Sequence, residues 1–158
     1  MKRREFIETT GMLSVASLVA LHQSSSLFSG IVGKKDIGIQ LYTVRDAMTA
    51  DPKGTLKTLA ALGYNDVECA GYAEGKFYGM TVAEFKMVLA DLGLTMNSGH
   101  TLTGNHKKDQ TRTMVNQWEA ACEDFANVGM KSIVLAYLFD YERKKMDDYH
   151  YISDLLNK

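Results

Sequence analysis

The sequence of 158 residues has one proline, two cysteines and no long uninterrupted hydrophobic run. Its formal net charge is −1, so it lacks the basic excess that holds a nucleic-acid backbone. Cys69 and Cys122 match no metal-binding or redox spacing. We expect both to be buried small side chains, with a disulfide between them as the less favoured alternative. Nucleic-acid binding and a cysteine metal site are therefore disfavoured.

Two nucleotide-binding loops are also missing. No G-x-G-x-x-G pattern follows the first predicted strand, and no G-x-x-x-x-G-K pattern occurs anywhere in the chain. These glycines are what allows a backbone to approach a pyrophosphate closely. Dinucleotide and nucleoside-triphosphate binding therefore lose their main support.

The longest apolar stretch is residues 11–21, about eleven residues where a membrane-spanning helix needs about twenty. It follows Lys2, Arg3 and Arg4, and residues 24–26 are small serines. This order is typical of an export signal, and the Arg-Arg-x-Phe-Ile string resembles a twin-arginine signal, with a general secretory signal as the alternative. We predict a signal peptide over residues 1–30, a periplasmic location and no stable membrane anchor.

After this leader a single pattern recurs three times, in which an amphipathic helix ends in glycine and an apolar residue begins a strand. The glycines are Gly63, Gly93 and Gly129, at spacings of 30 and 36 residues. A left-handed glycine closes many helices, and such spacings are typical of strand–helix units. The repeat therefore predicts parallel strands that alternate with helices.

The individual elements are also indicated. Asp51 and Pro52 begin one helix, and Thr81 with Glu84 forms a capping box for the next. The third helix has a core-facing stripe of Met114, Trp118, Ala121, Phe125 and Val128. The predicted strands are 37–44, 66–70, 94–99 and 132–138.

These elements predict an α/β fold of the parallel (β/α) TIM-barrel type, with a doubly wound sheet as the runner-up. A complete barrel has eight strand–helix units in about 250 residues. We count about four units, so we expect residues 36–158 to be the N-terminal half of a barrel. The fourth helix, from residue 146, lacks the glycine ending of the others, which indicates a chain cut within that helix.

Barrel active sites lie at the carboxyl ends of the strands. Strand alternation directs Gln40, Tyr42 and Glu68 toward this mouth, and the third and fourth strands end there with His100 and Tyr137. Each also has a structural alternative. Glu68 would pair with a neighbouring strand, and the tyrosines would be wall residues. For His100 a functional role is favoured, because it follows a strand in a predicted Ser-Gly-His turn. Residues 142–145 read as a solvated charged segment.

Residues 37–46, 63–72, 77–85 and 98–100 resemble sugar phosphate isomerase/epimerase proteins with a xylose-isomerase-like barrel. The resemblance implies metal-assisted aldose–ketose isomerisation or epimerisation of a sugar or polyol, with a divalent ion such as manganese. It also implies carboxylates that remove and return a proton beside the substrate carbonyl. In these proteins the metal ligands are two glutamates, an aspartate and a histidine from the last four strands, so no metal or catalytic residue carries over to this chain. What carries over is a set of substrate-binding candidates: Gln40, Tyr42, Glu68 and His100.

Two readings of the polypeptide follow from the resemblance. The first is half of an isomerase or epimerase that is inactive alone and needs no metal by itself. The second is a non-catalytic truncated product or a carbohydrate-binding pseudo-enzyme. A zinc nuclease of the same superfamily is disfavoured by the export signal and by the lack of a basic surface. We also expect self-association, because two sheet edges and the inner face of the half-barrel would lack partners.

Overall fold

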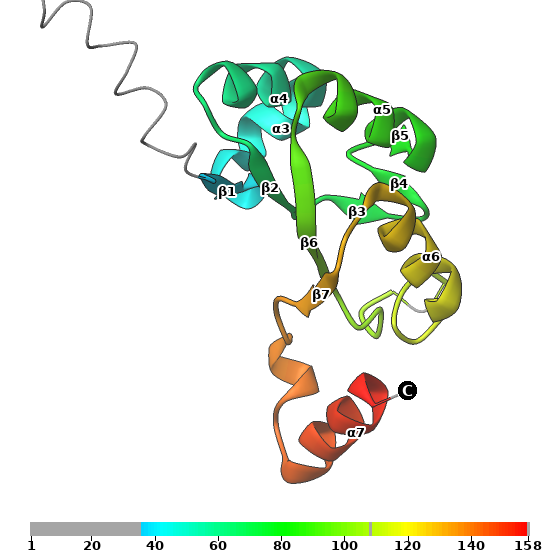
Figure 1. The fold of residues 1–158 in the computed structure, drawn as a ribbon. Helices are drawn as coiled ribbons and strands as arrows, with labels where there is room; N and C mark the ends of the chain where they lie inside the picture. The colour runs from blue at the N-terminus through cyan, green and yellow to red at the C-terminus, as the bar shows by residue number, and fades with distance from the viewer. Residues whose placement is uncertain (1–35, 108, 158) are drawn as a thin grey trace, which may run out of the picture. The chain divides into compact units, whose positions relative to one another are not determined.

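The computed structural model describes residues 36–107 and 109–157, so the predicted signal peptide lies outside the described residues. Four parallel strands form the main sheet in the order β1-β2-β6-β7, with β1 and β7 at its edges (Figure 1). Helices connect them along the chain, which confirms the α/β fold with a parallel sheet. The strands are β1 Gly38–Gln40, β2 Asp66–Cys69, β6 Thr95–Thr101 and β7 Ser132–Leu135.

The helices begin and end largely where the sequence predicts. Asp51 caps α4 by accepting a hydrogen bond from the Gly54 N–H, and Thr81 and Glu84 form the predicted capping box of α5. The three predicted glycines all have positive φ. Met114 lies outside α6, although it is buried. The α-helices are α3 Arg45–Ala50, α4 Pro52–Ala61, α5 Val82–Leu92, α6 Trp118–Val128 and α7 Met146–Leu156.

The predicted bounds of the strands need correction. The first strand ends at Gln40, and the next four residues form the 3₁₀-helix η1, Leu41–Val44. A 3₁₀ turn places residues three apart on one side, so both Leu41 and Val44 reach the core. The last strand ends at Leu135 instead of residue 138.

The third parallel strand runs two residues further than predicted. His100 and Thr101 pair with Val134 and Leu135 of β7, so both belong to β6. The prediction that His100 lies in a turn is therefore wrong. A residue held in a sheet has a better-defined side-chain direction than one in a turn. The direction of the His100 side chain is therefore fixed by its strand.

A small antiparallel sheet between β2 and α5 was not predicted, because its strands are too short for an alternating pattern to appear. Its strands are β3 Tyr72–Ala73, β4 Lys76–Phe77 and β5 Met80–Thr81. It contributes Phe77, whose fully buried ring stacks on Phe85 of α5 at a centroid distance of 5.0 Å. The small sheet thereby extends the hydrophobic core beyond the main parallel sheet.

The core lies on the helix side of the parallel sheet. Val67 and Cys69 of β2 and Met96 of β6 are buried there against residues of α4, α5 and α6. Side chains of the opposite face are mostly polar and partly exposed; they include Gln40, Glu68, Ser98 and His100. The inner face of the described sheet is thus largely polar, and its edge strands β1 and β7 each pair with one described neighbour.

Both cysteines are free in the described structure. Cys69 is buried in the core, as expected, and Cys122 of α6 is partly exposed. Burial raises the pKa of the Cys69 thiol to about 11. The less favoured disulfide between the two is therefore absent from this structure.

One charged residue of the predicted solvated segment is buried. Only 5% of Glu142 is exposed, and its carboxylate accepts hydrogen bonds from Thr103 Oγ1, from Asn105 Nδ2 at 3.0 Å and from the Phe139 N–H at 2.9 Å. Glu142 belongs to the 3₁₀-helix η2, Asp140–Glu142. The solvated interpretation is wrong for this residue, because three donors replace the water that a buried carboxylate loses.

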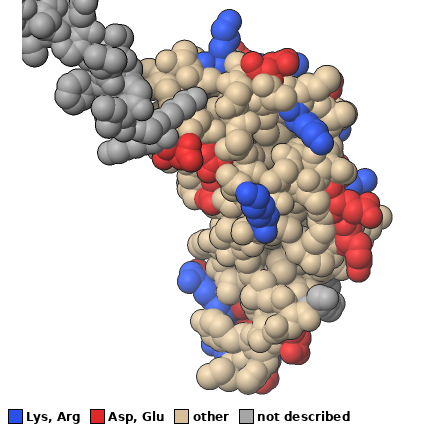
Figure 2. Space-filling view, in the orientation of Figure 1, with Lys and Arg blue, Asp and Glu red and all other residues tan. Residues whose placement is uncertain are grey.

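Charged side chains of both signs are interspersed over the face shown in Figure 2. Within residues 36–107 and 109–157, no helix has the length and apolarity needed to cross a membrane. On α7 the apolar side chains of Ile152 and Leu155 are buried, whereas those of Met146, Tyr149 and Leu156 are at least half exposed.

Candidate functional site

Four polar side chains meet on the open face of the parallel sheet, with Glu68 of β2 at their centre. Gln40 Nε2 donates a hydrogen bond to Glu68 Oε1 at 2.6 Å, and Ser98 Oγ donates one to Glu68 Oε2 at 2.6 Å. His100 Nε2 lies 3.0 Å from Glu68 Oε1. We call these four residues the Glu68 network.

The strand register explains why these residues meet. Gln40 of β1 lies opposite Glu68, and Glu68 lies opposite Ser98 of β6. Paired residues of neighbouring parallel strands point to the same face, and His100 is two residues beyond Ser98 on the same strand. Three strands therefore deliver four polar groups to one place.

The network favours an ionised Glu68. Its pKa lies below the ordinary value, chiefly because Ser98 and then Gln40 donate hydrogen bonds to the carboxylate, with the charge of His100 as a smaller cause. Burial opposes this shift, but the Glu68 side chain is still 28% exposed and His100 is 21% exposed. A ligand can therefore reach both groups.

Two proton arrangements fit the His100 contacts. An ionised carboxylate only accepts hydrogen bonds, so His100 bonds to Glu68 when its Nε2 carries a proton. Gln40 Nε2 also lies 3.1 Å from His100 Nε2, and it donates a hydrogen bond to that nitrogen when the nitrogen carries no proton. One imidazole proton thus decides whether His100 is bound to Glu68 or to Gln40.

A pocket of about 490 Å³ opens beside the Glu68 network and shares His100 with it. Residues at or just beyond the carboxyl ends of all four parallel strands line it; these are Tyr42, Ala70, His100 and Ala136. The segment between β6 and α6 supplies the remaining wall together with Tyr72 and Phe139. This is the end of the sheet at which the barrel fold predicts an active site.

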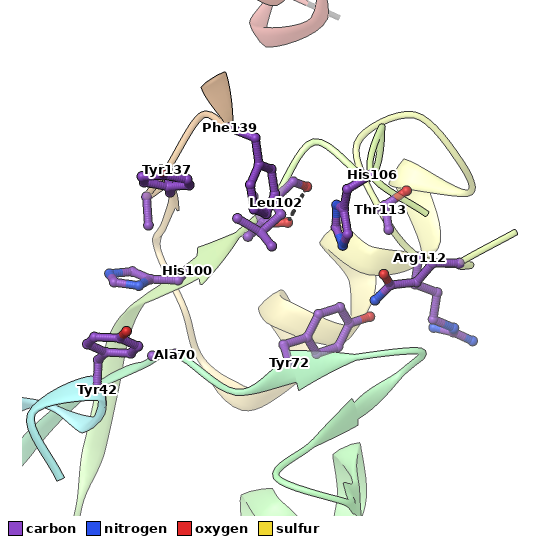
Figure 3. A pocket seen from close by; sticks show the side chains of 13 residues that line it. Tyr42, Ala70, Tyr72, His100, Leu102, His106, Arg112, Thr113, Tyr137 and Phe139 are labelled. Atoms are coloured by element: carbon purple, nitrogen blue, oxygen red, sulfur yellow. Dashed lines mark hydrogen bonds between the residues drawn. The ribbon is translucent and has the colours of Figure 1, made fainter. Parts of the chain in front are cut away.

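The pocket has two polar ends. Figure 3 shows His100 between Tyr42 and Tyr137 at one end, and Tyr72, His106, Arg112 and Thr113 at the other, which we call the Arg112 end. Leu102 and Phe139 lie between these groups. The lining therefore offers hydrogen-bonding groups at both ends and apolar surface in the middle, as small-molecule pockets often do.

The structure brings Gln40, Glu68 and His100 into direct contact, and it places Tyr42 in the same pocket as His100. Tyr42 belongs to η1 instead of the predicted strand, and it is 56% exposed with the Arg45 guanidinium 5.0 Å from its ring centre. Tyr137 also lines the pocket. That these residues bind substrate stays a prediction.

The Arg112 end was not predicted from the sequence. Tyr72 OH donates a hydrogen bond to Asp124 Oδ2 at 2.6 Å, and Arg112 Nη1 contacts the same oxygen at 2.5 Å. Burial, followed by the hydrogen bond with Asp124, raises the pKa of Tyr72. Arg112 follows a loop without periodicity, so no sequence pattern links it to Tyr72, 40 positions earlier. Ser98 was also missed, although it shares the strand face of His100.

The described residues do not fit the divalent metal that the resemblance implies. Among residues 36–107 and 109–157, no group of three or more His, Cys, Asp or Glu side chains lies in a metal-binding arrangement. Glu68 and His100 are adjacent, but they are a pair and they bond to each other. The arrangement supports hydrogen bonding to a polar ligand, and we derive no step through a metal from it.

Comparison with known proteins finds solved structures with a similar fold. No protein-family model and no curated protein matches the sequence. Two crystal structures of sugar phosphate isomerase/epimerase proteins from Parabacteroides distasonis are similar to it. One is 27% identical, with a TM-score of 0.57 over 80% of this chain and 46% of that chain. The other is 24% identical, with a TM-score of 0.55 over 78% and 50% respectively.

The 158-residue chain thus spans about half the length of the solved structures that it matches. These structural neighbours agree with the fold type and with the family resemblance of the sequence. The shared fold is a barrel type in which the ends of the strands carry the site, and in this chain those ends carry the Glu68 network and the pocket.

Proposed function

We propose that residues 36–157 form the substrate-contacting wall of a sugar phosphate isomerase/epimerase-type site, and that the Glu68 network binds hydroxyl groups of a sugar or polyol. The observation that carries the proposal is the network itself, at the carboxyl ends of β1, β2 and β6. A sugar hydroxyl both donates and accepts hydrogen bonds. An ionised Glu68 accepts, the Gln40 amide and Ser98 hydroxyl donate, and His100 does either.

The geometry favours binding over mere strand pairing. Glu68 and His100 stay 28% and 21% exposed beside a pocket of about 490 Å³, so a ligand can reach the groups that also join the strands. Tyr42 and Tyr137 place aromatic rings on both sides of His100 (Figure 3). Such rings offer flat apolar surface for the C–H groups of a sugar ring.

The reaction of the intact protein would be metal-assisted aldose–ketose isomerisation or epimerisation. The described half offers no three-ligand metal cluster, so we assign the metal and the proton transfers to residues outside it. The purified 158-residue chain is then inactive. We expect no turnover of D-fructose or D-xylulose with added Mn²⁺, and measurable turnover would overturn this assignment.

Binding can be tested without turnover. We expect D-fructose to shift backbone amide NMR signals of β2 and β6, and Glu68→Gln to weaken the binding roughly tenfold by removing a charged acceptor. Glu119→Gln is the matched control, because Glu119 is an exposed residue of α6. Equal affinity in the wild-type protein and the Glu68→Gln variant would rule out the network as the sugar site.

The main alternative is a carbohydrate-binding protein without catalysis. This alternative uses the same binding wall, so sugar binding in the NMR titration would agree with both functions. Only a turnover measurement separates the isomerase from the non-catalytic protein. A variant completed with the missing barrel half provides the test: the isomerase proposal expects Mn²⁺-dependent turnover from it, and the alternative expects binding alone.

We also propose that residues 1–30 direct export to the periplasm. The Arg3–Arg4 pair before a weakly apolar run supports the twin-arginine route. Replacing both arginines by lysine should keep the charge and abolish export of a reporter fused to these residues. Unchanged export would leave the general secretory route.

A further inference from the structure

Rings dominate the pocket that adjoins the Glu68 network. Six of its thirteen lining residues carry a ring, and three more have apolar side chains. The ring-bearing residues are Tyr42, Tyr72, His100, His106, Tyr137 and Phe139. The volume of about 490 Å³ lies in the range of about 300–1,000 Å³ that encloses drug-sized ligands, which are larger than one sugar ring. A sugar ring at His100 therefore leaves the middle of the pocket and the Arg112 end uncovered (Figure 3).

Phe139, in the middle of the pocket, is held in place by other rings. Its ring lies nearly parallel to that of Tyr141 at a centroid distance of 5.6 Å, and the Tyr137 ring meets it edge-on at 5.3 Å. The centre of the His106 imidazole lies 5.1 Å from it. Stacked and edge-on pairs are favourable arrangements of rings. The flat apolar surface of Phe139 is thus in place before a ligand binds, which lowers the entropic cost of binding.

Tyr72 forms a second fixed surface at the Arg112 end. Its hydroxyl donates a hydrogen bond to Asp124 Oδ2 at 2.6 Å. Its ring centre lies 4.4 Å from that of Phe125 and 4.9 Å from that of Phe77. Because the hydroxyl is already bonded, the side chain adds chiefly the carbon surface of its ring to the pocket. Phe139 and Tyr72 therefore give the pocket two preformed apolar surfaces.

The Arg112 end offers hydrogen bonds without requiring a charged ligand. Arg112 Nη1 bonds to Asp124 Oδ2 at 2.5 Å, so its positive charge already has a partner. Gln110 adds an amide, which both donates and accepts. A purely apolar ligand would leave these groups without partners. A second sugar ring suits them better, because it has C–H groups on its faces and hydroxyl groups around its edge.

We propose that the pocket binds the second ring of a disaccharide whose first ring lies at the Glu68 network. The C–H faces of the second ring lie against Phe139 and Tyr72, and its hydroxyl groups bond to Arg112 and Gln110. The proposed isomerisation needs a free carbonyl carbon, so the first ring is the reducing sugar. The inference rests on the proposed sugar site and deepens it, because it names a disaccharide as the ligand in place of a single sugar.

NMR titration of the full 158-residue chain tests the subsite. The probes are D-fructose and three reducing disaccharides that link a second ring to D-fructose at different positions: turanose, lactulose and isomaltulose. We expect the best of the three to bind roughly tenfold more tightly than D-fructose, since covering about 60 Å² of apolar surface is enough for that gain. The disaccharide should also shift amide signals of residues 102–106 and 139, which D-fructose should shift less.

Two variants assign the gain to these rings. Phe139→Ala should remove most of the tenfold gain, because it deletes the apolar surface in the middle of the pocket. His106→Ala should reduce the gain roughly threefold, and it leaves the core intact because His106 is exposed. Tyr149→Ala is the matched control, an aromatic residue of α7 that is 50% exposed and lies outside the pocket lining. Glu68→Gln should weaken D-fructose and the disaccharides by the same factor, so the gain persists.

The outcomes separate the two proposals. If D-fructose binds but no disaccharide gains, or if the gain survives both variants, the second-ring subsite is refuted and the sugar site stands. If methyl β-D-galactopyranoside, the second ring of lactulose alone, shifts the signals of His106 and Phe139 while D-fructose does not bind, the subsite stands and the sugar site is refuted. Binding of none of the probes refutes both. Should Phe139→Ala not fold, the His106→Ala result decides.

Discussion

Ser98 Oγ donates a hydrogen bond to Glu68 Oε2 at 2.6 Å, across two neighbouring strands whose register places the two residues opposite each other. This bond is the largest cause of the low pKa of Glu68. The other carboxylate oxygen faces Gln40 and His100. Ser98 is therefore a positioning residue, which fixes one oxygen while the second meets the groups next to the pocket.

Ser98→Ala should raise the pKa of Glu68. The substitution removes the strongest of the hydrogen bonds that stabilise the charged form, and it leaves burial, which favours the neutral form, in place. The pKa of Glu68 is measured by NMR titration of its side-chain carboxyl carbon. Ser132→Ala is the matched control, since Ser132 lies opposite Ser98 on β7. An unchanged pKa in Ser98→Ala would show that the bond does not form in solution.

The stability of the fold should fall in acid partly through Glu68. Because its folded-state pKa is below the unfolded value, Glu68 stabilises the fold above the unfolded pKa, and this contribution is lost as the pH falls through the folded pKa. Urea unfolding at about pH 6 and about pH 3 measures the effect, since an ordinary glutamate titrates near pH 4.3. Glu68→Gln should lose less stability between these two pH values than the wild type. A loss of the same size would mean that other carboxylates carry the acid sensitivity.

Glu142→Ala should loosen the segment that leads into α7. Three donors, from Thr103, Asn105 and the Phe139 backbone, would lose their shared acceptor. We expect a cost of about 2 kcal/mol, because hydrogen bonds to a charged group each contribute about 1.5–3 kcal/mol and the opened site admits water. Hydrogen exchange of residues 139–156 checks this, with the exposed Glu123→Ala as the control. Unaltered exchange in Glu142→Ala would contradict the buried anchor.

The two thiols should differ in reactivity. Only the thiolate attacks an alkylating reagent, and burial raises the pKa of Cys69 to about 11. Cys122 is partly exposed and has a smaller upward shift, also from burial. Mass spectrometry after iodoacetamide treatment of the native protein at about pH 8 should therefore find modification first at Cys122, with Cys69 modified only after unfolding. Equal labelling of both would indicate that the core around β2 opens readily.

The edges of the parallel sheet should drive self-association of the 158-residue chain. β1 and β7 each pair with a single described neighbour, and Val134 of β7 is 37% exposed. Edge pairing between copies satisfies backbone groups that otherwise bond to water. Light scattering should show dimers that Val134→Lys weakens and the exposed helix variant Met87→Lys does not. A monodisperse monomer in the wild type would refute edge pairing.

The sequence predicted the repeating fold well because its signals are local. Helix signals act on backbone groups only a few residues away along the chain; they include the Asp51 cap, the Thr81–Glu84 capping box and the glycines after the helices. Alternation also placed Gln40 and Glu68 on one face correctly, whereas His100, predicted in a turn, joins them as a residue of β6. The predicted end of β1 was wrong, because burial of Leu41 and Val44 in the core favours a 3₁₀ turn over a longer strand.

What the sequence by itself determined is therefore the class of fold, the faces of its strands and the polar residue types at their ends. Only the tertiary structure decided which of those residues touch, that Ser98 lowers the pKa of Glu68, that Glu142 is buried, and that Arg112 meets Tyr72 through Asp124. The reason is physical. Periodicity and caps are set by neighbours along the chain, whereas these contacts depend on strand register and on loops whose paths are fixed by packing.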